Sequence, residues 1–178
     1  MNVITIRPAS PLDLAALQAI GRKTFEEAFA ANNSEENLAA YLEEGFSKEK
    51  LEAELRNENS KFYFALQTNE IIGYLKVNMG DAQSEKQDPN ALEIERIYVL
   101  QQYHGKQVGL LLYEQALAIA KERKAPYMWL GVWEENPRAI RFYQKQGFVE
   151  FGEHIFQLGD DAQRDVLMKK MLPTLFEE

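Results

Sequence analysis

The sequence predicts a single α+β domain over residues 1–178, in which helices flank a mixed β-sheet that carries a β-bulge in its central strand. Three observations lead to this fold class. The chain has 178 residues, 46 % of them hydrophobic, which suits one domain with its own core. Its patterns follow the order strand, helices, hairpin, strand, helix, strand, helix, hairpin. The alternation of apolar residues within 92–99 slips by one position, as a bulged strand requires.

The N-terminal third is expected to be mainly helical after one short strand. Apolar residues alternate in 3–6, which predicts the strand. A first helix begins at Ser10-Pro11, with proline in its first turn, and runs to about Phe25 or beyond. Serine residues also mark the starts of a second helix over 34–45 and a third over 48–57.

A β-hairpin is expected next. Residues 61–67 are rich in aromatic and apolar side chains, and 71–79 form the partner strand across a turn at 68–70. The polar, acidic segment 80–90 contains Pro89 and is expected to be a loop.

The central strand carries the predicted bulge. Leu92 and Ile94 are apolar at even positions, whereas Ile97 and Val99 are apolar at odd positions. One extra residue in the strand places both pairs of apolar side chains on the same face of the sheet. Such a bulge bends the strand and redirects the side chains beside it.

A turn with two glycines follows the bulged strand. Residues 103–109 surround Lys106 and lead into a helix from Val108 to about Lys124, which Pro126 ends. The first amides of a helix have no intrahelical partner, and the helix dipole places partial positive charge there. The turn is therefore a candidate phosphate-binding element. An ordinary strand-to-helix loop, with glycine for tight geometry, explains the same pattern.

The C-terminal part returns to the sheet. Residues 127–133 are nearly all apolar, which predicts a strand buried on both faces. Asn136 and Pro137 suit the N-cap and first turn of a helix over 138–146, and Gly147 suits its C-terminal end. The remaining expected elements are a strand beginning over 148–151, a hairpin of strands 154–158 and 165–172 around 159–161, and a tail without expected structure from Pro173 onward.

Composition excludes several classes of function. The chain has no cysteine and two histidines, so no metal site is expected. A net charge of −8 disfavours nucleic acid as a partner and favours cations, although a soluble acidic surface explains the same charge. No apolar run approaches the roughly 18 residues of a membrane span, and the N-terminus lacks a signal-peptide pattern. We therefore expect a cytoplasmic protein with no membrane partner.

Two stretches resemble the GNAT (Gcn5-related N-acetyltransferase) superfamily. Residues 104–109, HGKQVG, resemble its acetyl-CoA loop, Gln/Arg-x-x-Gly-x-Gly/Ala, matching at Gly109 and departing at His104 and Gln107. Residues 129–148 resemble the segment in which a strand leads to Asn-x-x-Ala-x-x-Phe-Tyr and then Gly-Phe. The matching positions are Asn136, Ala139, Phe142, Tyr143, Gly147 and Phe148. Both motifs, in this order, resemble the family, and the layout of the whole chain fits its fold.

The resemblance implies that acetyl-CoA is the co-substrate. In the family, the backbone beside the bulge meets the pantetheine arm, and the loop holds the pyrophosphate. The residues that the resemblance assigns to the coenzyme are Ile97, Tyr98, Val99, His104, Gly105, Lys106, Gln107, Val108, Gly109, Asn136 and Tyr143. For Asn136, a role as helix N-cap is compatible with a coenzyme contact.

The resemblance also implies two catalytic residues. Tyr143 corresponds to the tyrosine that acts as general acid near the coenzyme sulfur, although a core tyrosine explains its spacing as well. Glu95 lies nearest the phase slip and is preferred over Glu93 as a base, or as a relay through water. A solvated strand carboxylate remains the alternative for Glu95. His104 and His154 are interpreted as surface or loop histidines.

The resemblance extends to bacterial spermidine/spermine N-acetyltransferases. It implies an enzyme that acetylates a primary amine of a small molecule, with a polyamine such as spermidine or spermine as acceptor. Other small amines, a protein N-terminus and a non-catalytic CoA-binding module stay open. Tyr143 argues against the module, and the departures at His104 and Gln107 argue mildly for it. The oligomeric state is open, a homodimer being one alternative.

Overall fold

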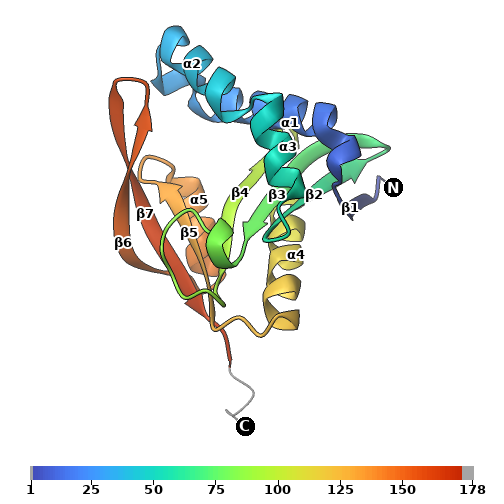
Figure 1. The fold of residues 1–178 in the computed structure, drawn as a ribbon, viewed down its shortest axis with the longest axis vertical. Helices are drawn as coiled ribbons and strands as arrows, with labels where there is room; N and C mark the ends of the chain where they lie inside the picture. Colours follow the sequence, from blue (N-terminus) through green and yellow to red (C-terminus); the bar gives the residue numbers. More distant parts are fainter. Residues whose placement is uncertain (1, 174–178) are drawn as a thin grey trace.

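A mixed β-sheet forms the centre of the computed structural model, which describes residues 2–173 (Figure 1). Within these residues the sheet is seven-stranded, in the order β1-β2-β3-β4-β5-β7-β6. Neighbouring strands are antiparallel except β4 and β5, which are parallel. The strands are β1 (Ile4–Pro8), β2 (Ser60–Gln67), β3 (Glu70–Asn78), β4 (Leu92–Val99), β5 (Tyr127–Trp133), β6 (Val149–Leu158) and β7 (Asp161–Met171). The predicted α+β class and mixed sheet are confirmed.

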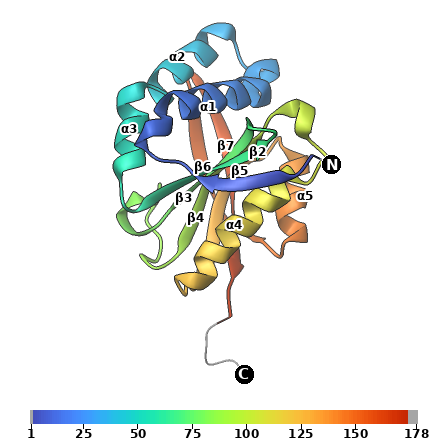
Figure 2. The same cartoon turned by 90° about the vertical axis from the view of Figure 1, so that its right-hand side faces the viewer.

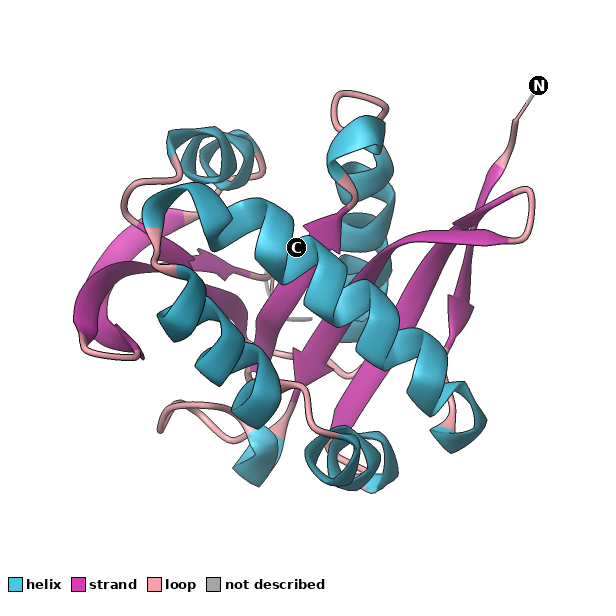
Figure 3. Cartoon of the chain, turned by 90° about the horizontal axis from the view of Figure 1, so that it is seen from above, coloured by secondary structure: helices cyan, strands magenta, loops and turns pink. Residues whose placement is uncertain are grey.

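Helices cover both faces of the sheet. They are α1 (Leu14–Phe29), α2 (Glu35–Gly45), α3 (Lys48–Arg56), α4 (Val108–Glu122) and α5 (Pro137–Lys145). Apolar residues of α1–α3 pack with Phe62, Phe64 and Tyr74, whereas those of α4 and α5 share a second core with Leu75 and Val77. Figure 2 shows α1–α3 and α4–α5 on different sides of the strands. Figure 3, seen from the end where α1 and α2 lie, shows helices crossing in front of the sheet. No helix in residues 2–173 has the length and apolar character needed to cross a membrane.

Serine caps begin the N-terminal helices, as the sequence predicts. Ser34 and Ser47 accept hydrogen bonds from the amides of Asn37 and Lys50 at 3.1 and 3.2 Å. Ser10 forms a capping box with Asp13 and begins a short 3-10 turn that continues into α1. The first helix extends to Phe29, because Phe25 and Phe29 are both buried in the core beneath it.

The C-terminal hairpin differs from the prediction. The segments expected as separate strands, 148–151 and 154–158, belong to the single strand β6. A register shift between Glu150 and Gly152 interrupts the alternation and explains why the sequence pattern appeared broken. Its partner β7 begins at Asp161 rather than Asp165, so the hairpin is longer than expected. The tail 174–178 lies outside the described residues.

The hairpin tip is fastened to α2 and the segment before it. Asn37 Nδ2 donates a hydrogen bond to Asp160 Oδ1 at 2.6 Å, and Gln163 Nε2 donates one to Asn33 Oδ1 at 3.0 Å. Figure 1 shows the red hairpin rising beside the blue α2. These two bonds, called the hairpin tie below, join the N-terminal helices to the C-terminal strands.

Candidate functional site

The predicted bulge is present and separates β4 from β5. Between β3 and β4, Lys76 pairs with Arg96 and Val77 pairs with Ile94, so Glu95 is the extra residue. The parallel pairing of β4 with β5 covers Leu92 and Glu93, and no further pair between these strands follows in the described chain. Beyond Glu93 the β5-facing backbone of β4 is therefore left without a strand partner.

Two hollows meet at this splay. The α4 groove, of about 530 Å³, lies over the start of α4 and is lined by Val99, Gly105, residues 107–110 and Phe142. The bulge cavity, of about 500 Å³, is lined by residues 93–96 of β4, residues 129–133 of β5, His154 and Asp165. Both hollows are lined by Ala28, Ile97, Tyr98, His104, Asn136, Ala139 and Tyr143. A molecule in one hollow can thus meet a molecule in the other beside these residues.

The start of α4 presents unpaired amides to its groove. Gln107 is the N-cap, with a left-handed φ of 64° and no side-chain capping bond, and Gly105 has a φ of 78°. Within residues 2–173 no protein group accepts a hydrogen bond from the amides of 105–110. A Cβ built at Gly109 would meet nothing within 4 Å, so the backbone there is open to approach. The geometry is that of an anion site.

The predicted loop residues differ in where their side chains lie. Lys106 is absent from the lining of the α4 groove, and its Nζ lies 5.2 Å from the ring centre of Tyr103. His104 is exposed but held, because its Nε2 lies 2.9 Å from the Val99 carbonyl oxygen and its Nδ1 lies 2.7 Å from Arg138 Nη1. Arg138 can only donate, so Nδ1 accepts and Nε2–H donates to Val99. His104 is therefore a surface histidine, as predicted, and its side chain also connects β4 to α5.

Tyr143 stands where the two hollows join. Its side chain is 5 % exposed and packs edge-on against Phe142 and Phe148. Burial raises the pKa of its hydroxyl, which makes no hydrogen bond within residues 2–173. The residue is thus both a core aromatic and a protonated donor facing the junction. Asn136 lines the same junction while its Oδ1 caps α5 through the amide of Ala139 at 3.1 Å.

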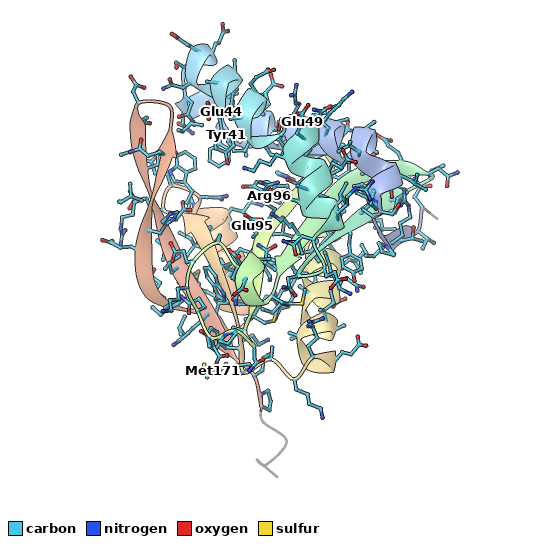
Figure 4. The ribbon with its side chains drawn as sticks, viewed as in Figure 1. Tyr41, Glu44, Glu49, Glu95, Arg96 and Met171 are labelled. Carbon is cyan, nitrogen blue, oxygen red and sulfur yellow. The ribbon has the colours of Figure 1, made fainter. Side chains whose placement is uncertain are left out.

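The preferred carboxylate, Glu95, belongs to a buried network of ion pairs. Lys76 Nζ contacts Glu95 Oε2 and lies 3.3 Å from Glu54 Oε2. Burial opposes ionisation of Glu95, but Lys76 and Arg96 hold its pKa below the ordinary value. Arg96 Nη1 is 3.9 Å from Glu54 Oε2, and its guanidinium lies 4.9 Å from the ring centre of Phe46. Figure 4 shows Tyr41, Arg96 and Glu95 between the N-terminal helices and the sheet.

The alternative carboxylate, Glu93, has a different environment. It is 2 % exposed, and its Oε1 accepts hydrogen bonds from Asn78 Nδ2 at 2.9 Å and the Ser84 amide at 2.7 Å. Its Oε2 accepts a further bond from the Ser84 hydroxyl. Burial raises the pKa of Glu93 despite these donors. Glu93 therefore anchors the 79–91 loop to β4, whereas Glu95 is ionised by neighbouring cations.

Several lining residues of the bulge cavity were missed by sequence reasoning. Tyr41 comes from α2 and Phe46 from the turn after it, whereas Asp165 and His154 come from the C-terminal hairpin. Nothing in their local sequence distinguishes them from ordinary helix and strand residues. Their proximity depends on the hairpin tie, which joins segments more than a hundred positions apart.

Comparison with known proteins identifies the class. Residues 22–148 match the Acetyltransferase (GNAT) family. The match covers well over half of the chain, which therefore belongs to this family of acetyltransferases.

Relatives identify the reaction more closely. An uncharacterized N-acetyltransferase of Lactobacillus delbrueckii subsp. lactis is 42 % identical over 172 residues, covering 97 % of this chain and 99 % of that protein. Spermidine N(1)-acetyltransferase of Thermoplasma acidophilum is 30 % identical over 149 residues, covering 82 % and 88 %. The structure of PaiA N-acetyltransferase from Thermoplasma acidophilum, in complex with coenzyme A, has a TM-score of 0.78 at 27 % identity and covers 96 % and 99 % of the two chains. The chain is an N-acetyltransferase, and the CoA-bound relative supports acetyl-CoA as its co-substrate.

Proposed function

We propose that this enzyme transfers the acetyl group of acetyl-CoA to a primary amine of a polyamine such as spermidine or spermine. The coenzyme lies in the α4 groove, and the amine approaches from the bulge cavity. The observation that carries the proposal is the junction of the two hollows at Tyr143, with carboxylates on the acceptor side.

The α4 groove accounts for coenzyme binding. The pyrophosphate accepts hydrogen bonds from the unpaired amides between Gly105 and Gly109, where the helix dipole favours negative charge. The pantetheine arm lies along residues 97–99, whose backbone has no partner on β5. Asn136 and Tyr143 flank the thioester at the junction.

The acceptor side must attract an ammonium group and then release its proton. An alkyl ammonium with a pKa of about 10.4 is mostly protonated at neutral pH. Ionised Glu95 attracts the ammonium group. Because a carboxylate paired with Lys76 is a weak base, it does not keep the proton of the ammonium but relays it to water. Glu93, the alternative base, has the higher pKa of the two but is occupied by three donors.

Tyr143 acts on the leaving group. The neutral amine attacks the thioester carbon, and the nitrogen, which is now positively charged, releases a proton to water. The carbonyl then re-forms, and the carbon–sulfur bond breaks with its electron pair on sulfur. The raised pKa of Tyr143 keeps the phenol protonated, so it donates a hydrogen bond to the thiolate as charge develops. A phenol is a weaker acid than a thiol of pKa about 8.5, so full proton transfer from Tyr143 is completed with help from solvent.

A polycationic acceptor fits the charge of the bulge cavity. Its lining includes five carboxylates, Glu85, Glu93, Glu95, Glu135 and Asp165, against one arginine, Arg96, and the histidines His104 and His154. Glu54 lies beside Arg96 and offsets part of its charge. The spermidine N(1)-acetyltransferase relative supports the same acceptor class. The alternatives are another small amine and a protein N-terminus.

The test is release of free thiol from acetyl-CoA. Purified protein is mixed with acetyl-CoA and, separately, spermidine, spermine, a monoamine, an amino acid and a peptide with a free N-terminus. With the polyamines we expect thiol release above the protein-free rate. The polyamines should also have the highest kcat/KM of the panel. Turnover confined to the amino acid or the peptide would contradict the polyamine assignment.

A further inference from the structure

Three side chains from distant segments converge on the wall of the bulge cavity. Glu85 comes from the 79–91 loop, His154 from β6 and Asp165 from β7, and all three line the cavity. His154 and Asp165 are direct cross-strand partners. His154 Nδ1 lies 3.9 Å from Asp165 Oδ2, and His154 Nε2 lies 3.6 Å from Glu85 Oε1. The imidazole thus stands between two carboxylates.

Asp165 differs from the other buried carboxylates of the cavity. Its side chain is 20 % exposed, yet in residues 2–173 no group donates a hydrogen bond to its carboxylate, His154 being too distant. Glu93 has three such donors and Glu95 contacts Lys76, whereas Glu135 is exposed to solvent. Burial raises the pKa of Asp165. A half-buried carboxylate without a protein donor takes its hydrogen bonds from water or from a ligand in the cavity.

The neighbouring strand, β5, has a glycine beside this carboxylate. Gly131 interrupts the apolar run of β5, and a Cβ built there would lie 3.4 Å from Asp165 Oδ2. A side chain at 131 would therefore occupy the cavity next to Asp165. An ammonium group supplies the N–H donors that this carboxylate lacks among residues 2–173.

Aromatic side chains form part of the cavity lining. Phe29 and Trp133 pack with ring centres 5.4 Å apart, and both line the cavity with Tyr41. Tyr41 also stacks on Phe25 with ring centres 4.4 Å apart, which extends the aromatic part of the cavity lining. Aromatic faces suit a methylene chain and its flanking cations.

We propose that Asp165, assisted by Glu85, binds a second ammonium group of the acceptor while the reacting amine lies beside Glu95 and Tyr143. The inference rests on the proposed function and specifies it: the preferred acceptors are diamines or longer polyamines, held at two cationic nitrogens.

The experiment compares two acceptors of equal carbon chain length, 1,4-diaminobutane and 1-aminobutane, with saturating acetyl-CoA. The wild-type enzyme is expected to show a kcat/KM at least about tenfold higher for the diamine, because a charge-assisted hydrogen bond discriminates by about this factor. Asp165→Asn should lose most of this preference through a higher KM for the diamine, with a smaller rise in the KM for the monoamine. Glu85→Gln should have a smaller effect in the same direction.

Asp81→Asn is the matched control, since Asp81 is exposed on the 79–91 loop and the change in net charge is the same. It should leave the preference intact. An unchanged melting temperature and an unchanged affinity for CoA in Asp165→Asn report a folded protein. A diamine preference that survives both Asp165→Asn and Glu85→Gln would overturn the two-nitrogen site. Absence of turnover by the wild type on every diamine and polyamine would instead contradict the proposed function itself.

Discussion

Lys76 forms a buried ion pair with Glu95, the extra residue of the β4 bulge. Lys76 is 4 % exposed and also lies 3.3 Å from Glu54 of α3, so one cation joins the helix layer to the bulge. The carboxylate at the splay is thereby fixed in position and ionised at neutral pH.

Removing this cation should destabilise the fold in a pH-dependent way. Lys76→Met removes the cation that contacts both Glu95 and Glu54 and leaves them only Arg96. We expect the free energy of unfolding to fall by about 3 kcal/mol at pH 7, typical of a broken buried pair. The folded-state pKa of Glu95 is depressed, so its stabilising contribution is complete above the unfolded pKa of about 4.3 and is lost as pH falls through the lower folded value. The difference in the free energy of unfolding between wild type and variant should therefore be smaller at about pH 3 than at pH 7.

Urea unfolding at the two pH values measures this difference. Lys61→Met is the control, because Lys61 is exposed in the neighbouring strand, and it should change stability by less than about 0.5 kcal/mol. Equal stability of Lys76→Met and wild type at pH 7 would refute the role of the pair.

Tyr143→Phe separates catalysis from packing. Phenylalanine keeps the ring contacts with Phe142 and Phe148 but has no hydroxyl to offer the leaving thiolate. Turnover should fall by about 10²-fold, the lower end of general acid catalysis, because a thiolate is already a fair leaving group. Coenzyme affinity and melting temperature should stay near the wild-type values. Full activity in the variant would remove Tyr143 from the mechanism and leave solvent as the proton source.

Gly109→Pro tests the anion site at the start of α4. Proline removes one of the unpaired amides, while the first turn of a helix tolerates its ring. Affinity for CoA, measured by titration calorimetry, should fall by at least about tenfold, the effect of losing a hydrogen bond to a charged group. Gly109→Ala is the control, since it keeps the amide and adds a Cβ to open space, and it should have a smaller effect. Unchanged affinity in a folded proline variant would place the pyrophosphate elsewhere.

Added salt should weaken binding of the acceptor more than it affects the reaction with the coenzyme. The chain carries a net charge of −8, and carboxylates outnumber cations in the bulge cavity. Screening over about 10 Å at 0.1 M salt reduces long-range attraction of a polycation. The KM for spermidine should therefore rise between low and moderate salt, with the KM for 1-aminobutane rising less. A spermidine KM that is flat over this range would mean that the acidic surface serves solubility alone.

Local signals allowed much of the fold to be predicted. The strand expected at 127–133 is β5, and the caps at Ser34 and Ser47 are present, because apolar runs and capping residues act within a few positions. The bulge was also predictable, since one extra residue changes the phase of a strand. The residues assigned to the coenzyme gather along one contiguous part of the chain, from Ile97 to Tyr143, and most of them line the α4 groove.

The acceptor side could not be predicted in the same way. The bulge cavity draws on α1, α2, the 79–91 loop and both strands of the C-terminal hairpin. The cross-strand pairing of His154 with Asp165 depends on the bulge in β6, which also concealed the continuity of that strand. Proximity of this kind depends on strand register and helix docking, and no short motif encodes it.

The hairpin tie also makes the shape of the bulge cavity depend on the two ends of the chain together. Asn37 with Asp160 and Asn33 with Gln163 hold the N-terminal helices against the C-terminal hairpin, and both of these segments contribute to the cavity lining. A substitution that breaks the two hydrogen bonds should therefore alter the bulge cavity and leave the α4 groove, which the hairpin does not line, as it is.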